Sequence, residues 1–299
     1  MLEKIQKPND IKKIPADQLP ALAEEIREFI IESLSKTGGH LASNLGVVEL
    51  TIAMHRVFDL PKDKLIWDVG HQSYTHKILT GRKLGFATLR QYGGMSGFPK
   101  TQEDPADAFN TGHSSTSISA GLGMAQAREL TGDNYYVVSV IGDGALTGGM
   151  AYEALNNAAR LKKNFIIVLN DNQMSIDTNV GAISKHLNSL RTSNRYQAFK
   201  DNFKQFRDMV PVIGKPAYSV LEKVRDSAKL LLLEGAVFEG MDFKYIGPVD
   251  GHDLPELIEL FKNVQQMYGP ILIHVKTEKG RGYPCLLYTS PSPRDRQKS

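Results

Sequence analysis

Hydrophobic and polar positions follow two periods along the chain, and both are clearest within residues 138–176. An apolar run ends at Ile141 and is followed by Gly142, Asp143 and Gly144. A continuous apolar run over 165–169 is typical of a buried parallel strand, and the stretch between shows a helical stripe at Met150, Ala154, Leu155 and Ala158. The pattern predicts a strand, a tight turn, a helix, a second strand and a polar turn at 170–172.

Two polar residues of this unit are expected to meet at one edge of a sheet. Parallel strands end on the same side, so Asp143 and Asn172 should lie close together. Carboxylate and amide oxygens suit a hard divalent cation that holds phosphate groups, most naturally magnesium. The glycines beside Asp143 also let backbone N–H groups approach an anion. The unit therefore predicts a magnesium and diphosphate anchor.

Upstream of this unit the pattern predicts two helices and a short strand. Residues 1–20 are polar and contain three prolines, which predicts a lead-in arm outside the core. Apolar residues of helical period cover 22–34 and 48–57, and the glycine-rich elbow between them carries His40. A strand at 65–67 breaks directly before His71. Ligand crevices of α/β proteins form just past strand ends, so His71 is a candidate site residue.

A loop-rich stretch over 84–107 leads to a second glycine-bounded turn, which carries Gly112, His113 and Ser114. The Ser and Thr residues at 114–116 are expected to cap a helix over 118–130. Gly121 and Gly123 of that helix are expected to pack closely on a sheet.

Downstream, residues 182–216 are polar and predict a flap over the site. Further patterns predict a helix over 219–233, a turn and then a helix capped by Asp253, and a strand over 271–275. The repeated alternation predicts an α/β fold with a mostly parallel sheet and helices on both faces, formed by residues 21–284. Residues 285–299 lack any period and predict a foreign or disordered tail on a sequence cut in mid-protein.

Composition narrows the class of protein. The 299 residues are 41% hydrophobic, which allows a sizeable core. The net charge of +3 comes from dispersed Lys and Arg residues and indicates no nucleic-acid partner. Cys285 is the only cysteine, which excludes an intrachain disulfide and a Cys-based zinc site. The N-terminus lacks an apolar segment and the apolar runs are short, which predicts a cytoplasmic protein without membrane contact.

Two common nucleotide motifs are absent from the turn at Asp143. A dinucleotide fingerprint needs a third glycine where Thr147 stands, and no GxxxxGK[ST] phosphate loop occurs anywhere in the chain. Among the histidines, His40, His71 and His113 lie in glycine-bounded turns and are candidate site residues. We interpret His55, His76 and His186 as structural, and the basic stretch 185–229 as a solvated flap. His252 and Asp250 are open to a turn-forming or a site role.

Several longer segments together resemble the 1-deoxy-D-xylulose-5-phosphate synthase family, which depends on thiamine diphosphate. They are SKTGGHLASNLG, WDVGHQSYTHKILTGR, FNTGHSSTSIS, GDGALTGGMAYEALNNA, VLNDNQMSI, YIGPVDGHD and KTEKGRGY, between residues 35 and 283. The resemblance implies a homodimeric, transketolase-like transferase that makes 1-deoxy-D-xylulose 5-phosphate from pyruvate and glyceraldehyde 3-phosphate with loss of CO2. This product feeds isoprenoid, thiamine and pyridoxal synthesis.

Carried over residue by residue, the resemblance implies a set of site residues. The magnesium ligands would be Asp143, Asn172 and the carbonyl of Met174. Gly144 and Ala145 would offer backbone N–H groups to the diphosphate at a helix N-terminus. Further cofactor contacts would be His71, Gly112, His113, Ser114 and Tyr283. The resemblance also implies that His40 faces the substrate and that His40 and His71 are catalytic.

The resemblance covers only the first domain of the family, so we expect the pyrimidine-binding and C-terminal domains to be missing from this sequence. The chain alone is therefore expected to bind cofactor weakly and to be inactive. Two alternatives stay open: another enzyme of the transketolase type or a pyruvate-type dehydrogenase component, and a non-catalytic cofactor-binding module. The segments GGHLASNLG and YIGPVDGHD disfavour the other enzymes.

Overall fold

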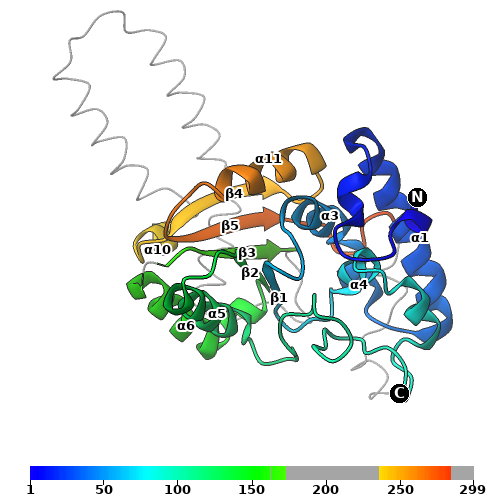
Figure 1. Ribbon diagram of the computed structural model, residues 1–299, viewed down its shortest axis with the longest axis horizontal. Coiled ribbons are helices and arrows are strands. Elements are labelled where there is room, and N and C mark those ends of the chain that lie inside the picture. Colours follow the sequence, from blue (N-terminus) through cyan, green and yellow to red (C-terminus); the bar gives the residue numbers. More distant parts are fainter. Residues whose placement is uncertain (162, 173–235, 284–299) are drawn as a thin grey trace, which may run out of the picture.

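The computed structural model describes residues 1–161, 163–172 and 236–283 (Figure 1). Within them, five parallel strands form one sheet in the order β1-β2-β3-β5-β4. The strands are β1 (Lys64–Trp67), β2 (Val137–Gly142), β3 (Phe165–Asp171), β4 (Lys244–Asp250) and β5 (Pro270–Lys276). The predicted flap, the predicted helix over 219–233, the predicted tail, Met174 and His186 lie outside the described residues.

Helices cover both faces of this sheet, as the α/β prediction requires (Figure 1). Side chains alternate between the faces along β3: Ile166 and Val168 join one hydrophobic core, whereas Ile167 and Leu169 join the other. The first core contains α1 (Leu19–Thr37), α3 (Val48–Val57), α4 (Tyr74–Leu79) and α11 (Leu254–Val264). The second contains α5 (Ser117–Thr131), α6 (Gly149–Leu161) and α10 (Ala236–Glu239). No helix in these ranges is long and apolar enough to cross a membrane.

The N-terminal segment is part of the core, so the predicted arm outside it is wrong. Leu2, Ile5, Ile11 and Ile14 are all buried in the first core. Their spacing follows no regular period because the segment folds as three short 3-10 helices, Leu2–Lys4, Asp10–Lys13 and Ala16–Gln18. Irregular spacing of this kind concealed the apolar face from a periodicity argument.

The predicted helices over 22–34, 48–57 and 118–130 and the strands over 65–67 and 271–275 are confirmed. The elbow between the first two helices holds a further short helix, α2 (Leu41–Leu45), and a 3-10 helix spans Lys83–Thr88. Asp253 caps α11 as predicted, because its side chain accepts the Glu256 N–H at 3.0 Å.

Four local predictions are wrong. The turn expected before α11 is the edge strand β4, where a register shift between Ile246 and Val249 accommodates Pro248. Asn170 and Asp171 pair within β3 instead of forming a turn. Met150 of the predicted apolar stripe is 49% exposed. The Ser/Thr cluster does not cap α5; the Asp68 carboxylate, from the end of β1, accepts the Ser117 N–H at 2.9 Å.

Candidate functional site

The carboxyl ends of β1, β2 and β3 lie side by side because these strands are consecutive in the sheet. Gly142 pairs with Asn170, so Asp143 and Asn172 follow directly on neighbouring strand ends. The Asp143 N–H donates to the Asn170 carbonyl at 3.2 Å and continues the ladder. Asp143 is buried and Asn172 is half-buried. The expected meeting of these two residues at one sheet edge agrees with this register.

The turn after Asp143 differs from the expected direct entry into a helix. Gly144 precedes a 3-10 helix at Ala145–Thr147, and α6 begins only at Gly149. The backbone N–H groups of Gly144 and Ala145 therefore belong to a one-turn helix and not to the first turn of α6. The helix dipole expected to favour an anion acts from Gly149, several residues further along the chain.

Three predicted histidines come together beyond the end of β1. The ring centroids of His40 and His71 are 5.5 Å apart in an edge-to-face contact, and those of His71 and His113 are 6.1 Å apart and stacked. Phe98 contacts both outer histidines, with centroids 5.9 Å from His40 and 5.9 Å from His113. These four residues, the histidine cluster, come from four separate segments of the chain.

Burial keeps two members of the histidine cluster neutral. Burial, together with the neighbouring His40 and His113, lowers the pKa of His71 to about 3. Burial also lowers the pKa of His40, with Arg90 and His113 adding to the effect. Among the described residues, the Nδ1 atoms of His40 and His71 are buried without a hydrogen-bond partner. Each ring therefore retains a buried nitrogen that can serve a bound group.

Asn44 fixes the backbone on which the cluster is built. Its amide nitrogen donates to the carbonyls of His40 at 2.7 Å and His71 at 2.8 Å. Its amide oxygen accepts the Tyr74 N–H at 2.8 Å. Asn44 is fully buried on α2, so this one side chain joins the elbow to the segment after β1.

The backbone before His71 adopts a strained turn. Val69 has a φ of +59°, a conformation in which a β-branched residue is strained, and the Gly70 N–H donates to the Asp68 carbonyl at 2.5 Å. A side chain at Gly70 would overlap Thr111 and would come within 2.5 Å of Pro99 Cδ. The turn therefore requires glycine at position 70 and directs the chain sharply away from the sheet at His71.

The turn with Gly112, His113 and Ser114 lies against the start of α6. The Ser114 N–H donates to the Gly112 carbonyl at 2.8 Å. A Cβ atom added to Gly148 would lie 2.6 Å from Ser115 Oγ, so the two turns pack closely. Ser114 is exposed and Gly112 half-buried. The structure thus brings this turn beside the segment that follows Asp143.

The loop after β5 approaches the elbow of His40. The Gly280 N–H donates to the Ala42 carbonyl at 2.9 Å, and Tyr283 at the end of this loop is 42% exposed. His252 holds the same loop, because its Nε2 accepts the Glu278 N–H at 2.9 Å. The Nδ1 atom of His252 lies 3.0 Å from Glu49 Oε2, and the backbone N–H of His252 donates to the Asp250 carboxylate. His252 and Asp250 therefore form a turn that also anchors the loop of Tyr283.

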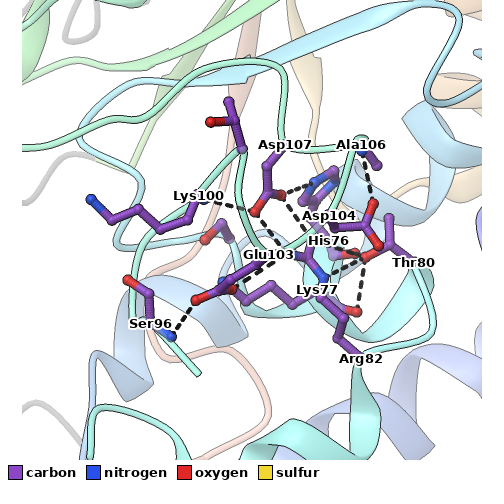
Figure 2. A network of polar contacts seen from close by, with 12 residues as sticks. His76, Lys77, Thr80, Arg82, Ser96, Lys100, Glu103, Asp104, Ala106 and Asp107 are labelled. Atoms are coloured by element: carbon purple, nitrogen blue, oxygen red, sulfur yellow. Dashed lines mark hydrogen bonds and ion pairs between the residues drawn. The ribbon is translucent and has the colours of Figure 1, made fainter. Parts of the chain in front are cut away.

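A buried polar network supports the segment between Phe98 and His113 (Figure 2). Asp107 accepts hydrogen bonds from His76 at 3.0 Å and from Arg82 at 2.7 and 2.8 Å. His55 Nε2 lies 2.9 Å from His76 Nδ1, and Lys77 donates to Glu103 at 2.5 Å. Burial lowers the pKa of both histidines. This network agrees with the structural interpretation of His55 and His76.

Sequence reasoning missed several residues of this edge. Phe98 and Asn44 carry no motif of their own, and Asp68 caps a helix distant in sequence. His274 was also missed, although its sequence signal is plain: it is a polar residue inside the apolar run of β5. Its Nε2 lies 3.0 Å from Asp171, next to the candidate cation site.

The donor atoms at the sheet edge fit magnesium in type. Within the described residues, no group of three His, Cys, Asp or Glu side chains could hold a metal ion. Asp143 and Asn172 instead offer one carboxylate and one amide oxygen, which are hard ligands that leave coordination positions for phosphate oxygens.

A family model described as 1-deoxy-D-xylulose-5-phosphate synthase matches residues 2–277. A 1-deoxy-D-xylulose-5-phosphate synthase of Geobacter sulfurreducens is 57% identical over 283 residues, which are 95% of this chain and 44% of the relative. One from Carboxydothermus hydrogenoformans is also 57% identical over 283 residues, 95% of this chain and 46% of the relative. The chain therefore spans less than half the length of these curated relatives.

Solved structures resemble the fold at lower identity. A transketolase from Campylobacter jejuni superposes with a TM-score of 0.66 at 19% identity, covering 90% of this chain and 39% of the transketolase. A transketolase from Leishmania mexicana gives a TM-score of 0.61 at 17% identity, covering 89% and 38%. These structures show a shared fold. The family model, which matches nearly the whole chain, shows that the chain belongs to the 1-deoxy-D-xylulose-5-phosphate synthase family.

Proposed function

We propose that this chain forms the diphosphate-binding part of an enzyme that makes 1-deoxy-D-xylulose 5-phosphate from pyruvate and glyceraldehyde 3-phosphate with loss of CO2. The observation that carries the proposal is the placement of Asp143 and Asn172 directly after the paired ends of β2 and β3. Family membership supports the reaction, and the contact between the half-buried His40 and His71 beyond β1 supports a site at the same edge.

The proposed cofactor is thiamine diphosphate with magnesium. Asp143 and Asn172 would hold the cation, with Met174, which lies outside the described residues, as a further ligand through its carbonyl. The backbone at Gly144 and Ala145 and the turn of Gly112, His113 and Ser114 would contact the diphosphate, and Tyr283 would contact the cofactor from the loop after β5. When bound, thiamine diphosphate supplies the electron sink that removal of CO2 from pyruvate requires.

The chain's own contribution to catalysis centres on His40 and His71. Because burial lowers the pKa of both imidazoles, each is neutral near pH 7 and can donate at one nitrogen and accept at the other. Their buried Nδ1 atoms lack partners among the described residues and are available to hold or move a proton at a bound substrate. His40 is proposed to face the substrate, and His71 both substrate and cofactor.

A chimera tests this function directly. Residues 2–277 would replace the matching part of the Geobacter sulfurreducens relative, and formation of 1-deoxy-D-xylulose 5-phosphate would be measured by mass spectrometry. We expect product from the chimera, a strong loss of kcat in its His40→Ala variant with nearly unchanged cofactor affinity, and no turnover by the 299-residue chain alone. A folded chimera without product, or full turnover by His40→Ala, would contradict the assignment.

We also propose that the whole enzyme is a homodimer located in the cytoplasm. A non-catalytic cofactor-binding module would bind thiamine diphosphate equally well but would give a chimera without product.

A further inference from the structure

Three side chains are joined by hydrogen bonds next to the candidate cation site. Tyr245 Oη is 2.7 Å from His274 Nδ1, and His274 Nε2 is 3.0 Å from Asp171 Oδ2. Tyr245 belongs to β4, His274 to β5 and Asp171 to the last position of β3. The three residues therefore join three neighbouring strands, and the series ends at Asp171, the residue directly before Asn172.

The donor and acceptor of each hydrogen bond between Tyr245, His274 and Asp171 can be assigned. A carboxylate only accepts, so His274 donates from Nε2 to Asp171 and accepts the Tyr245 hydroxyl at Nδ1. His274 is 2% exposed and Asp171 is 1% exposed. At this burial, loss of the two bonds would leave the ring nitrogens of His274 without these partners, so the arrangement holds the imidazole in one orientation.

Strand alternation separates the three polar residues at the end of β3. Asp171 continues the face of Ile167 and Leu169, which is the face of α5 and α6 and also that of His274. Asn170 lies on the opposite face, which is that of Ile166 and Val168, and Asn172 follows the last residue of β3. The Asp171 carboxylate is therefore directed to His274, whereas Asn172 remains the expected cation ligand.

The main chain at the end of β3 is held by hydrogen bonds from the residues that follow both neighbouring strands, β2 and β5. Asn170 accepts the Asp143 N–H through its carbonyl at 3.2 Å and the Thr277 hydroxyl through its side chain at 2.6 Å. The Thr277 N–H donates to the Asp171 carbonyl at 3.0 Å. The side chain of Asp171 adds the contact with His274, so the residue before Asn172 is fixed by both its backbone and its carboxylate.

We propose that His274, oriented by Tyr245, is a positioning residue that fixes Asp171 and thereby sets Asn172 for cation binding. This inference rests on the proposed magnesium site. Residues that orient a metal ligand without touching the metal commonly change metal affinity by about 10–100-fold when they are replaced. The same effect is expected here, because His274 is not one of the proposed ligands and acts through Asp171.

The test uses the 299-residue chain and measures the magnesium concentration that gives half-maximal thiamine diphosphate binding by calorimetry. His274→Phe removes both hydrogen bonds and should raise this concentration by about tenfold or more. Tyr245→Phe removes only the hydroxyl, retains the ring that stacks on Phe238 with centroids 6.1 Å apart, and should give a smaller increase of several fold. Excess magnesium should restore cofactor binding in both variants.

Tyr136→Phe is the matched control. The Tyr136 hydroxyl donates to the Gln265 carbonyl at 3.2 Å, and this hydrogen bond does not involve the end of β3. This variant should leave the magnesium midpoint unchanged. A purely structural role of His274 would lower the thermal midpoint but not change the magnesium midpoint of the folded variant, and that result would overturn the inference. If His274→Phe does not fold, an unchanged midpoint in Tyr245→Phe overturns it. A wild-type chain that binds no thiamine diphosphate would overturn the proposed function, and with it this inference.

Discussion

The imidazole rings of His40 and His71 meet edge to face with centroids 5.5 Å apart, although one follows α1 and the other follows β1. Burial lowers the pKa of both. The contact joins the helical elbow to the carboxyl edge of the sheet, where Asp143 lies. The two kinds of predicted site residue, histidines and cation ligands, thus occur along one edge of the fold.

The lowered pKa of His71 predicts a pH dependence of stability. The unfolded chain takes up a proton on His71 near pH 6.5, whereas the folded chain does so only near its pKa of about 3. Stability from this residue is therefore complete above about pH 6.5 and is lost as the pH falls toward 3, by up to about 1.4 kcal/mol per pH unit. Urea unfolding at pH 4.5–7.5 should show a steeper loss in the wild type than in His71→Gln. Equal slopes would show that the folded chain protonates His71 normally.

Replacement of Asn44 should disturb the histidine cluster without touching either ring. Asn44→Ala leaves the buried carbonyls of His40 and His71 without their donor, and we expect a loss of about 2–4 kcal/mol in the free energy of unfolding. Asn157→Ala is the control, because the Asn157 amide donates to the Glu153 carbonyl of its own helix at 3.3 Å, in an exposed hydrogen bond, and to no other described residue. NMR shifts of the His40 and His71 rings should change in the first variant only. An unaltered histidine spectrum in Asn44→Ala would contradict the positioning of the cluster by Asn44.

Two glycines of α5 form a matched pair for a packing test. A Cβ atom at Gly121 would lie 2.7 Å from the Phe165 ring, whereas nothing lies within 4 Å of one at Gly123. Gly121→Ala should therefore destabilise the fold by about 1–3 kcal/mol through overpacking. Gly123→Ala should stabilise it by about 0.5–1 kcal/mol, because alanine is the better helix former. Chemical denaturation of both variants measures the difference, and equal effects would show that α5 does not pack on β3 at Gly121.

Asp107 is expected to contribute stability that is lost at low pH. Burial alone would raise its pKa, but hydrogen bonds from Arg82 and His76 outweigh this and hold the pKa of the carboxyl well below its ordinary value. The contribution is present above the unfolded pKa of about 3.9 and is lost as the pH falls below it. Asp107→Asn should cost about 3–5 kcal/mol at pH 7, since it leaves Arg82 without its buried partner.

The difference between wild type and Asp107→Asn in the free energy of unfolding should narrow as the pH falls below about 4. The exposed Asp133 gives the control variant Asp133→Asn, which should lie within about 0.5 kcal/mol of the wild type. A gap that stays constant down to pH 3 would contradict the low pKa of Asp107.

The regular elements of this fold could be predicted from sequence because their burial is periodic. The apolar runs of β2, β3 and β5 and the stripes of α1, α3 and α5 each follow one period, and the structure confirms them. The edge strand β4 was missed because it is mostly exposed and contains Pro248, so it lacks an apolar run. The N-terminal 3-10 helices were missed because their buried residues follow no period.

The site could be predicted only in part. Residues in glycine-bounded turns at strand ends, such as His71 and Asp143, are recognisable because topology places such turns at one edge. Asn44, Phe98 and His274 act through contacts between distant segments, and no local pattern specifies those contacts. Conversely, the prediction that the N-terminus of the helix lies at Gly144 was wrong, because the residue at which a helix begins depends on packing.

The most direct test of the central claim is calorimetric titration of thiamine diphosphate into the 299-residue chain, with magnesium and then with EDTA. We expect binding only with magnesium, and a loss of affinity of at least about 100-fold in Asp143→Ala, which removes the carboxylate at the end of β2. Circular dichroism should show that the variant remains folded. Magnesium-dependent binding of unchanged affinity in folded Asp143→Ala would contradict the assignment of this sheet edge as the cation and diphosphate anchor.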